Sequence, residues 1–419
     1  MKKNILFLLI AGSLLYFFVN FHRTAIPGQI FDELQGDLAL PNANYIAAIG
    51  ASFMYVYALG QLLSGLMADR YGGFRTIFIG GALFAVGCAG TPFVNNFWMM
   101  AVLRALTGIG ACFMYICMIQ VLSQYCQKNF TVVFGFMMFF GYAGSIVAGS
   151  PFVACVNALG WRMSLAIIGF AILAIWALFA VLYKTVPKEP VKPVPFNLKP
   201  ILNVFRRGQN VRYGLFHCIN WGLFYTFLTV IGKKFLEDYC QMSAMAASTA
   251  ITAMATLSAV SNLGSGILSR LAGNRRKPIM AGCAVLALVC NAVILASLFC
   301  GFRHWSLVIV LLLFTITANI SPVQVAWVKE VNPPDQGGVT LATLNFAAYL
   351  CVALVSSAAG MLLEVFPAEI VEGIKVYGVN SYKLYFACAT VVLLPTVLTA
   401  ITIRETRGVP LSHEALSRS

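Results

Sequence analysis

The segment GLMADRYGGFR, residues 65–75, follows a long apolar stretch and returns in altered form as GILSRLAGNRR, residues 266–276. Both copies begin with glycine, carry a second glycine at the eighth position and end in arginine at the eleventh. Each copy also follows the second apolar stretch of its own part of the chain. A duplication explains why one polar loop recurs at the same place. The sequence therefore predicts two similar halves.

The chain around these loops has the composition of a membrane protein. Of its 419 residues, 60% are hydrophobic and only 10% are charged, which lies outside the range of water-soluble domains. The apolar stretches are about 20 to 28 residues long, enough for one helix to cross a hydrocarbon core of roughly 30 Å. We predict an all-α membrane protein of twelve transmembrane helices in two six-helix bundles. The predicted spans are 4–31, 43–67, 76–95, 97–125, 130–156, 162–184, 211–236, 244–269, 278–300, 305–328, 338–365 and 382–403.

One long polar segment, rich in proline and lysine, separates the halves at residues 183–210. Its prolines favour a stiff linker. Lys2 and Lys3 before the first apolar run resemble a secretory signal, but the run continues past Phe21, so we expect an uncleaved first span. The predicted organisation is an N-terminal bundle at 1–184, a cytosolic linker at 185–210, a C-terminal bundle at 211–404 and a cytosolic tail at 405–419.

The charges of the predicted loops indicate the orientation. Most of the 28 lysines and arginines fall on the side of the termini, whereas more than half of the 14 acids fall on the opposite side. Because cytoplasmic loops carry an excess of Lys and Arg, we predict a bacterial inner-membrane protein with both termini in the cytoplasm. The net charge of +14 is spread over many short segments, so we expect no nucleic-acid partner. The expected partners are the lipid bilayer and a small-molecule substrate, and the chain is expected to be a monomer.

The sequence contains no motif that indicates catalysis or a bound cofactor. Its twelve cysteines lie mostly within the spans and show no C-x-x-C pair or other metal-ligand spacing, so we expect neither metal nor cofactor. A nucleophile elbow, an H-E-x-x-H pair and a Walker loop are also absent from the sequence. We therefore expect neither an enzyme nor an ATP-driven pump.

The repeated loop resembles the signature G-x-x-x-D-R-x-G-x-x-R of the major facilitator superfamily. The matching residues are Gly65, Asp69, Arg70, Gly72 and Arg75. RALTGIG at 104–110 resembles the family's pattern in the fourth helix, and GYAGSIVAGSPF at 141–152 is similar to a glycine- and proline-rich motif of antiporters. FHR at 21–23 and GWR at 160–162 also occur in a bacterial branch. That branch resembles organic-anion and sugar-phosphate carriers and, more distantly, the lysosomal dipeptide transporter of animals.

This resemblance implies that the five matching residues form a gate. In that interpretation Asp69, with Arg70 and Arg75 close by, interacts with the N-terminus of the helix predicted to start near Gly338 and so stabilises one conformation. The alternative is that these charges only orient the chain. In the second half Arg270 stands where the first half has Asp69, so the second loop cannot copy a latch based on a carboxylate.

Arg23 is a cation inside the first predicted span. It forms one polar stripe with Tyr16 and Asn20, at i, i+4 and i+7. Because a buried arginine is costly unless it faces protein or water, we expect it to line a cavity, where its planar guanidinium suits a carboxylate or phosphate. The alternatives are snorkelling to the headgroups and pairing with Asp32. For the neighbouring His22 we expect helix packing, with proton coupling as the second option.

Further polar and aromatic residues recur at helical spacing in other spans. Arg104 shares a helix face with Tyr115, and both a structural hydrogen bond and a second anion contact are open for it. Trp221 and Tyr225 follow His217 in the seventh span, in a pattern typical of either packing or a cavity wall. The expected substrate-binding residues are Tyr16, Asn20, Arg23, Arg104, Tyr115, Trp221, Tyr225, Asn345 and Tyr349.

No aspartate or glutamate lies deep in any predicted span. Proton-coupled carriers commonly relay protons through buried carboxylates, so exchange or uniport is favoured over such symport. We therefore predict a secondary active or facilitative transporter that moves a small organic anion by alternating access. The alternatives are a carrier of zwitterions such as dipeptides, an exporter of amphiphilic drugs, and a membrane sensor with a transporter-like fold.

Overall fold

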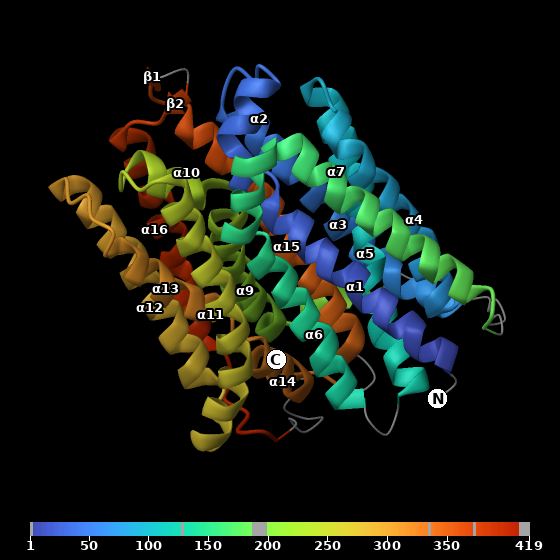
Figure 1. Cartoon of the computed structure of the whole chain (residues 1–419). Helices are drawn as coiled ribbons and strands as arrows, with labels where there is room; N and C mark the ends of the chain where they lie inside the picture. Colours follow the sequence, from blue (N-terminus) through green and yellow to red (C-terminus); the bar gives the residue numbers. More distant parts are fainter. Residues whose placement is uncertain (1–2, 127–129, 187–198, 334–336, 372–373, 410–419) are drawn as a thin grey trace.

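The computed structural model describes residues 3–126, 130–186, 199–333, 337–371 and 374–409. In Figure 1 the chain ends marked N and C lie at the bottom of a helical molecule, here called the terminal side. The opposite end, here called the distal side, carries α2 (Phe31–Asp37), α10 (Gly232–Asp238) and a hairpin of β1 (Glu369–Val371) and β2 (Ile374–Val376). The two strands are antiparallel, with Ile370 opposite Lys375.

The first half consists of long helices that run between the two sides. They are α1 (Lys3–Ala25), α3 (Ala43–Tyr71), α4 (Gly73–Gly90), α5 (Phe97–Tyr125), α6 (Phe130–Val147) and α7 (Ser150–Tyr183). Two of them begin at asparagine caps: Asn42 accepts from the N–H of Asn44, and Asn96 accepts from the N–H of Met99. α1 ends earlier than predicted, because Pro27 has no N–H with which to continue the helix. The short turn η1 (Gly28–Ile30) then leads into α2.

The boundary between the fifth and sixth predicted spans differs from the expected one. α6 stops at Val147, and residues 150–159 belong to α7. α7 is kinked at Gly160, which has a φ of 76° inside the helix. A residue without Cβ adopts this left-handed conformation at little cost. Residues 150–156 therefore form the distal start of the sixth element, although the sequence placed them at the end of the fifth.

The second half repeats this arrangement with more breaks. Its helices are α9 (Gly208–Thr226), α11 (Ala244–Leu271), α12 (Lys277–Cys300), α13 (Leu307–Ala318), α14 (Ser321–Val331), α15 (Gly337–Leu363) and α16 (Val379–Thr402). α9 continues through a π-helical segment, η4 (Phe227–Ile231), into α10, and together they cover the seventh predicted span. A further helix that the sequence did not predict, α8 (Lys199–Arg206), lies in the predicted linker, of which residues 187–198 are outside the described part.

In the described part of the chain, eleven helical segments are long and apolar enough to cross a membrane. The predicted fifth span corresponds to α6, whose described apolar stretch, Phe136–Val147, is shorter. Every predicted span thus coincides with a helical segment, which is consistent with twelve spans. The predicted class, an all-α membrane protein, is confirmed.

Candidate functional site

A central cavity lies between the two halves and has a volume of about 190 Å³. α1, α3, α5 and α6 line it from the first half, and α9, α11, α14 and α15 line it from the second. It extends to Tyr213 near the start of α9, Gln324 in α14 and Leu341 near the start of α15. In Figure 1 α14 lies on the terminal side. The cavity therefore runs from the middle of the molecule toward the terminal side.

Arg23, in the last turn of α1, lines this cavity although its side chain is only 6% exposed. One terminal nitrogen of its guanidinium donates to the Tyr349 hydroxyl at 3.0 Å, and the other donates to Asn20 Oδ1 at 2.5 Å. Its Nε is buried without a partner. Asp32, the alternative partner for Arg23, instead accepts from Lys234. Arg23 therefore faces the cavity as an arginine that no carboxylate in the described part of the chain neutralises.

Three tyrosine rings surround the guanidinium, and we call them the Arg23 cage. Its Cζ lies 4.9 Å from the ring centroid of Tyr225, 5.4 Å from that of Tyr349 and 5.6 Å from that of Tyr57. Such ring faces stabilise a cation, by about 2 kcal/mol or more where water is excluded. Tyr57 comes from the first half, and Tyr225 and Tyr349 come from the second. The cage therefore joins the halves around one positive charge.

Most of the substrate-binding residues predicted from the sequence meet in this cavity. The lining includes Tyr16, Asn20, Arg23, Tyr115, Trp221, Tyr225, Asn345 and Tyr349. The Tyr16 and Tyr115 rings stack at 5.8 Å, and those of Trp221 and Tyr225 lie 5.1 Å apart. The helical spacing of polar residues within apolar spans was therefore a sound guide to which side chains share the cavity.

Several cavity residues were not predicted. Tyr57, Tyr142 and Gln324 line the cavity together with the small polar residue Ser258. His217, which the sequence grouped with Trp221 and Tyr225, lines it as well. A glutamine in an apolar span is a usable signal, because its amide needs partners. A lone tyrosine is not such a signal, since its ring also packs well against apolar helices. Tyr57 and Tyr142 were missed for that reason.

Arg104 lies elsewhere, outside the described cavity lining. Its guanidinium donates to the main-chain oxygens of Ile26 at 3.0 Å and His22 at 3.4 Å, and its Cζ lies 4.6 Å from the Phe53 ring centroid. These two oxygens lie at the C-terminal end of α1, where carbonyls carry partial negative charge. The His22 oxygen also accepts from the Ile26 N–H at 3.2 Å, so Arg104 is its second donor. Of the two roles that the sequence left open for Arg104, the geometry favours the structural hydrogen bond.

We expect Arg104→Ala to destabilise the fold without removing a cavity contact. The substitution leaves the Ile26 carbonyl, at a buried helix end, without the Arg104 donor, at a cost of about 1–3 kcal/mol. Arg162→Ala is the matched control, because the Arg162–Asp37 pair is largely exposed, with side-chain exposures of 39% and 47%, and such pairs contribute about 0–1 kcal/mol. The measurement is the melting temperature of each purified variant in detergent, compared with that of the wild type. Equal losses of stability would contradict the assigned role.

His22 is fully buried and also lies outside the described cavity lining. Its ring sits 5.9 Å from that of Phe21 and 6.0 Å from that of Phe84, and neither ring nitrogen has a hydrogen-bond partner. A proton carrier needs a path to water or to a second titratable group. The surroundings of His22 therefore favour helix packing over proton coupling.

The repeated loop forms the turn between α3 and α4, where Gly72 has a φ of 86°. Arg70 and Arg75 both lie against the Tyr71 ring, at 5.3 and 5.5 Å from its centroid. The side chain of Asp69 and residues 334–336 lie outside the described part of the structure, so the gate interaction stays a prediction. The second copy of the loop, residues 266–276, makes its ion pair within its own half: Arg276 donates to Glu330 of α14 at 3.0 Å.

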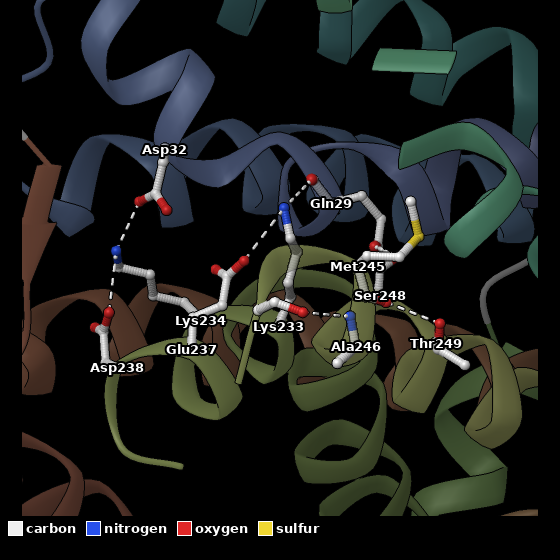
Figure 2. A network of polar contacts seen from close by, with 11 residues as sticks. Gln29, Asp32, Lys233, Lys234, Glu237, Asp238, Met245, Ala246, Ser248 and Thr249 are labelled. Carbon is white, nitrogen blue, oxygen red and sulfur yellow. Dashed lines mark hydrogen bonds and ion pairs between the residues drawn. The ribbon is translucent and has the colours of Figure 1, made fainter. Parts of the chain in front are cut away.

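The halves are tied together on the distal side by a polar cluster that we call the distal latch. It consists of Gln29, Asp32, Lys233, Lys234, Glu237 and Asp238 (Figure 2). Lys234 Nζ lies 2.7 Å from Asp32 Oδ1 of the first half and 3.1 Å from Asp238 Oδ1 of its own. Lys233 donates to the main-chain oxygen of Gln29 at 2.7 Å and lies 3.7 Å from Glu237. Each lysine therefore bridges both halves, a role that the sequence analysis did not assign to them.

A second carboxylate joins the halves nearby. Glu364, just after α15, accepts from the first N–H of α3, at Ala43, at 2.6 Å and from the Tyr377 hydroxyl at 2.8 Å. Burial raises the pKa of Tyr377, so this hydroxyl stays protonated and remains a donor. A carboxylate at a helix N-terminus is favourable both as a cap and through the helix dipole. The distal side is thus closed by contacts across the halves at two places.

Among the described residues, no group of three histidine, cysteine or acidic side chains is placed to hold a metal ion. The cavity offers one guanidinium together with phenol, amide, hydroxyl and aromatic groups. Such groups can bind a solute reversibly through hydrogen bonds and charge. The arrangement is chemically a binding chamber.

Comparison with known proteins gives the family. The chain matches the model of the Major Facilitator Superfamily over residues 8–404. Human monocarboxylate transporter 7 is 26% identical over 188 residues, which cover 44% of this chain and 36% of that protein. The probable sulfoacetate transporter SauU of Cupriavidus necator is 23% identical over 168 residues, which cover 39% of this chain and 38% of that one. The matched segments thus span little more than a third of these curated relatives.

Solved structures agree in fold over almost the whole chain. A D-xylose–proton symporter superimposes with a TM-score of 0.75 at 16% identity, covering 98% of this chain and 100% of its own. A bacterial homolog of the human lysosomal transporter Spinster, solved in an inward-facing and unoccupied conformation, gives a TM-score of 0.73 at 14% identity, covering 96% and 98%. These relatives are transporters and not enzymes, as predicted. The protein therefore belongs to the Major Facilitator Superfamily.

Proposed function

We propose that this transporter carries a small organic anion with a single negative charge. The observation that supports this most is the position of Arg23, the one permanently charged side chain among the described residues of the cavity lining. A charge in a site of low dielectric constant is costly without an opposite charge. A cargo anion supplies that opposite charge each time it binds. A guanidinium also presents two parallel donors that match a carboxylate or sulfonate.

The same lining favours an anion over a zwitterion. A dipeptide brings an ammonium group, which is usually held by a carboxylate, and the described lining contains neither aspartate nor glutamate. The names of the two curated relatives, for monocarboxylates and sulfoacetate, point in the same direction.

We further propose that transport proceeds by alternating access and that the structure corresponds to the inward-open state. The distal latch closes one side, and the cavity extends toward the other. The excess of lysine and arginine on the terminal side supports a cytoplasmic location for that side and for both termini. Arg23 then lies at the closed end of the cavity, as expected for a site that the inward-open and outward-open states share.

A matched pair of solutes tests the charge requirement. We expect purified protein in liposomes to exchange radiolabelled lactate, with benzoate and pyruvate as competitors, and to ignore lactamide, which keeps the shape of lactate without its charge. Equal competition by lactamide, or transport only of dipeptides or cationic amphiphiles, would contradict the proposal. Binding of an anion without any flux would indicate a sensor. Inclusion of sulfoacetate and a dicarboxylate in the panel reports whether one negative charge is preferred.

A further inference from the structure

The tyrosine at position 349 holds Arg23 from the opposite half. Its hydroxyl accepts from one terminal nitrogen of the guanidinium at 3.0 Å, and its ring lies against the same group. Tyr349 belongs to α15 of the second half, whereas Arg23 belongs to α1 of the first. The other hydrogen-bond acceptor, Asn20, lies one turn away on α1 itself and therefore moves together with Arg23. Tyr349 is thus the partner that links the charge to the opposite half.

The Tyr349 hydroxyl takes one of the five N–H donors of the guanidinium. A carboxylate bound in the bidentate manner takes two such donors. Asn20 takes one donor from the other terminal nitrogen, and the Nε donor has no partner. A cargo anion that binds this fork therefore shares the positive charge with the Tyr349 hydroxyl and weakens one of the contacts between the halves.

The contact between Tyr349 and Arg23 affects the return step, in which the carrier without cargo changes from one open state to the other. A bare guanidinium inside a closing cavity would be strongly unfavourable. That penalty would hold the empty carrier in place and enforce strict exchange of one anion for another. Here the phenol oxygen and the ring faces of Tyr225 and Tyr349 surround the cation from the opposite half. The two halves can therefore close around Arg23 with no anion present.

We propose that Tyr349 stands in for the cargo during the empty return step, so that the transporter performs net transport and not obligate exchange. This inference rests on the proposed anion transport at Arg23 and adds the transport mode to it. In the bound state the anion neutralises Arg23. In the empty state the Tyr349 hydroxyl and the Arg23 cage stabilise it, and the carrier cycles.

The test compares two fluxes from liposomes loaded with radiolabelled lactate, the first with unlabelled lactate outside and the second with none. The wild-type ratio of exchange to net efflux is expected to lie within about fivefold of unity. Tyr349→Phe keeps the ring and removes the hydroxyl. We expect it to raise the ratio of exchange to net efflux by about tenfold or more, because only the empty step loses its hydrogen bond. Retained exchange also shows that the variant is folded.

Tyr385→Phe is the matched control, because Tyr385 of α16 is also a buried tyrosine but lies outside the described cavity lining. Its two fluxes should keep the wild-type ratio. A wild-type exchange rate more than about a hundredfold above net efflux would overturn the inference while leaving anion transport in place. An equal fall of both fluxes in Tyr349→Phe would overturn it too, by giving Tyr349 a role in cargo binding alone. A wild-type protein that moves no anion in either assay contradicts the proposed function itself.

Discussion

Arg23→Ala is expected to lower anion transport strongly while leaving the protein folded and close to the wild type in stability. The guanidinium is the charged contact proposed for the cargo, and removal of one partner from a buried charge pair costs about 2–5 kcal/mol. That range corresponds to a fall of about thirtyfold to several thousandfold in kcat/KM for lactate uptake into liposomes. Removal of a buried cation that has no carboxylate partner relieves a desolvation cost. The loss of its hydrogen bonds and ring contacts opposes this gain. The melting temperature should therefore change little.

Arg23→Lys separates charge from shape. A lysine keeps the positive charge but offers a single ammonium group, which cannot match both oxygens of a carboxylate in one plane. We expect activity between those of the wild type and Arg23→Ala. Arg206→Ala, on the exposed surface of α8, serves as the control for loss of one arginine and should transport normally. Normal uptake by Arg23→Ala would contradict the anion site, and a large fall in its melting temperature would instead indicate a structural role for Arg23.

The sequence predicted the fold and the centre of the cavity for the same physical reason. Apolar stretches long enough to span a bilayer can be recognised from the composition of about 20 consecutive residues. A charge within such a stretch, such as Arg23, is costly enough that it has to face protein or water. Asn20 and Tyr16 followed from Arg23 by helical spacing alone. These features depend on neighbours within one helix, which a linear sequence contains directly.

The remaining features depend on contacts between distant parts of the chain. The hydrogen bond from Arg23 to Tyr349 joins residues 326 positions apart, and no local pattern encodes it. Arg104 shows that a charge within an apolar span does not always line the cavity. Carbonyls at a helix end can accept the hydrogen bonds of a buried arginine as a cargo anion would. Lys233 and Lys234 sit at the end of an apolar stretch, where sequence position alone cannot distinguish a surface charge from an inter-half contact.

Asp32→Asn is expected to open the distal side and shift the carrier away from the inward-open state. Lys234 is 1% exposed and links Asp32 of the first half to Asp238 of its own half. Asparagine keeps the size of the side chain but loses its charge, while the Lys234–Asp238 pair remains intact. The asparagine oxygen can still accept from Lys234, so the loss is the part that the charge adds to the hydrogen bond, about 1–1.5 kcal/mol. The ratio of closed to open distal sides should therefore fall by about fivefold to tenfold.

A cysteine pair across the same side of the molecule reports this shift. The Ser150 and Thr252 hydroxyl oxygens lie 3.3 Å apart and belong to opposite halves, so Ser150→Cys with Thr252→Cys should form a disulfide when the distal side is closed. The exposed Cys155 and Cys300 are first replaced by serine. Asp32→Asn should slow disulfide formation under a mild oxidant. Glu237→Gln is the matched control, because its pair with Lys233 lies within the second half and its loss should leave the rate unchanged. If the two variants slow the reaction equally, the link between the halves does not run through Asp32, and general loss of charge on the distal side explains the effect.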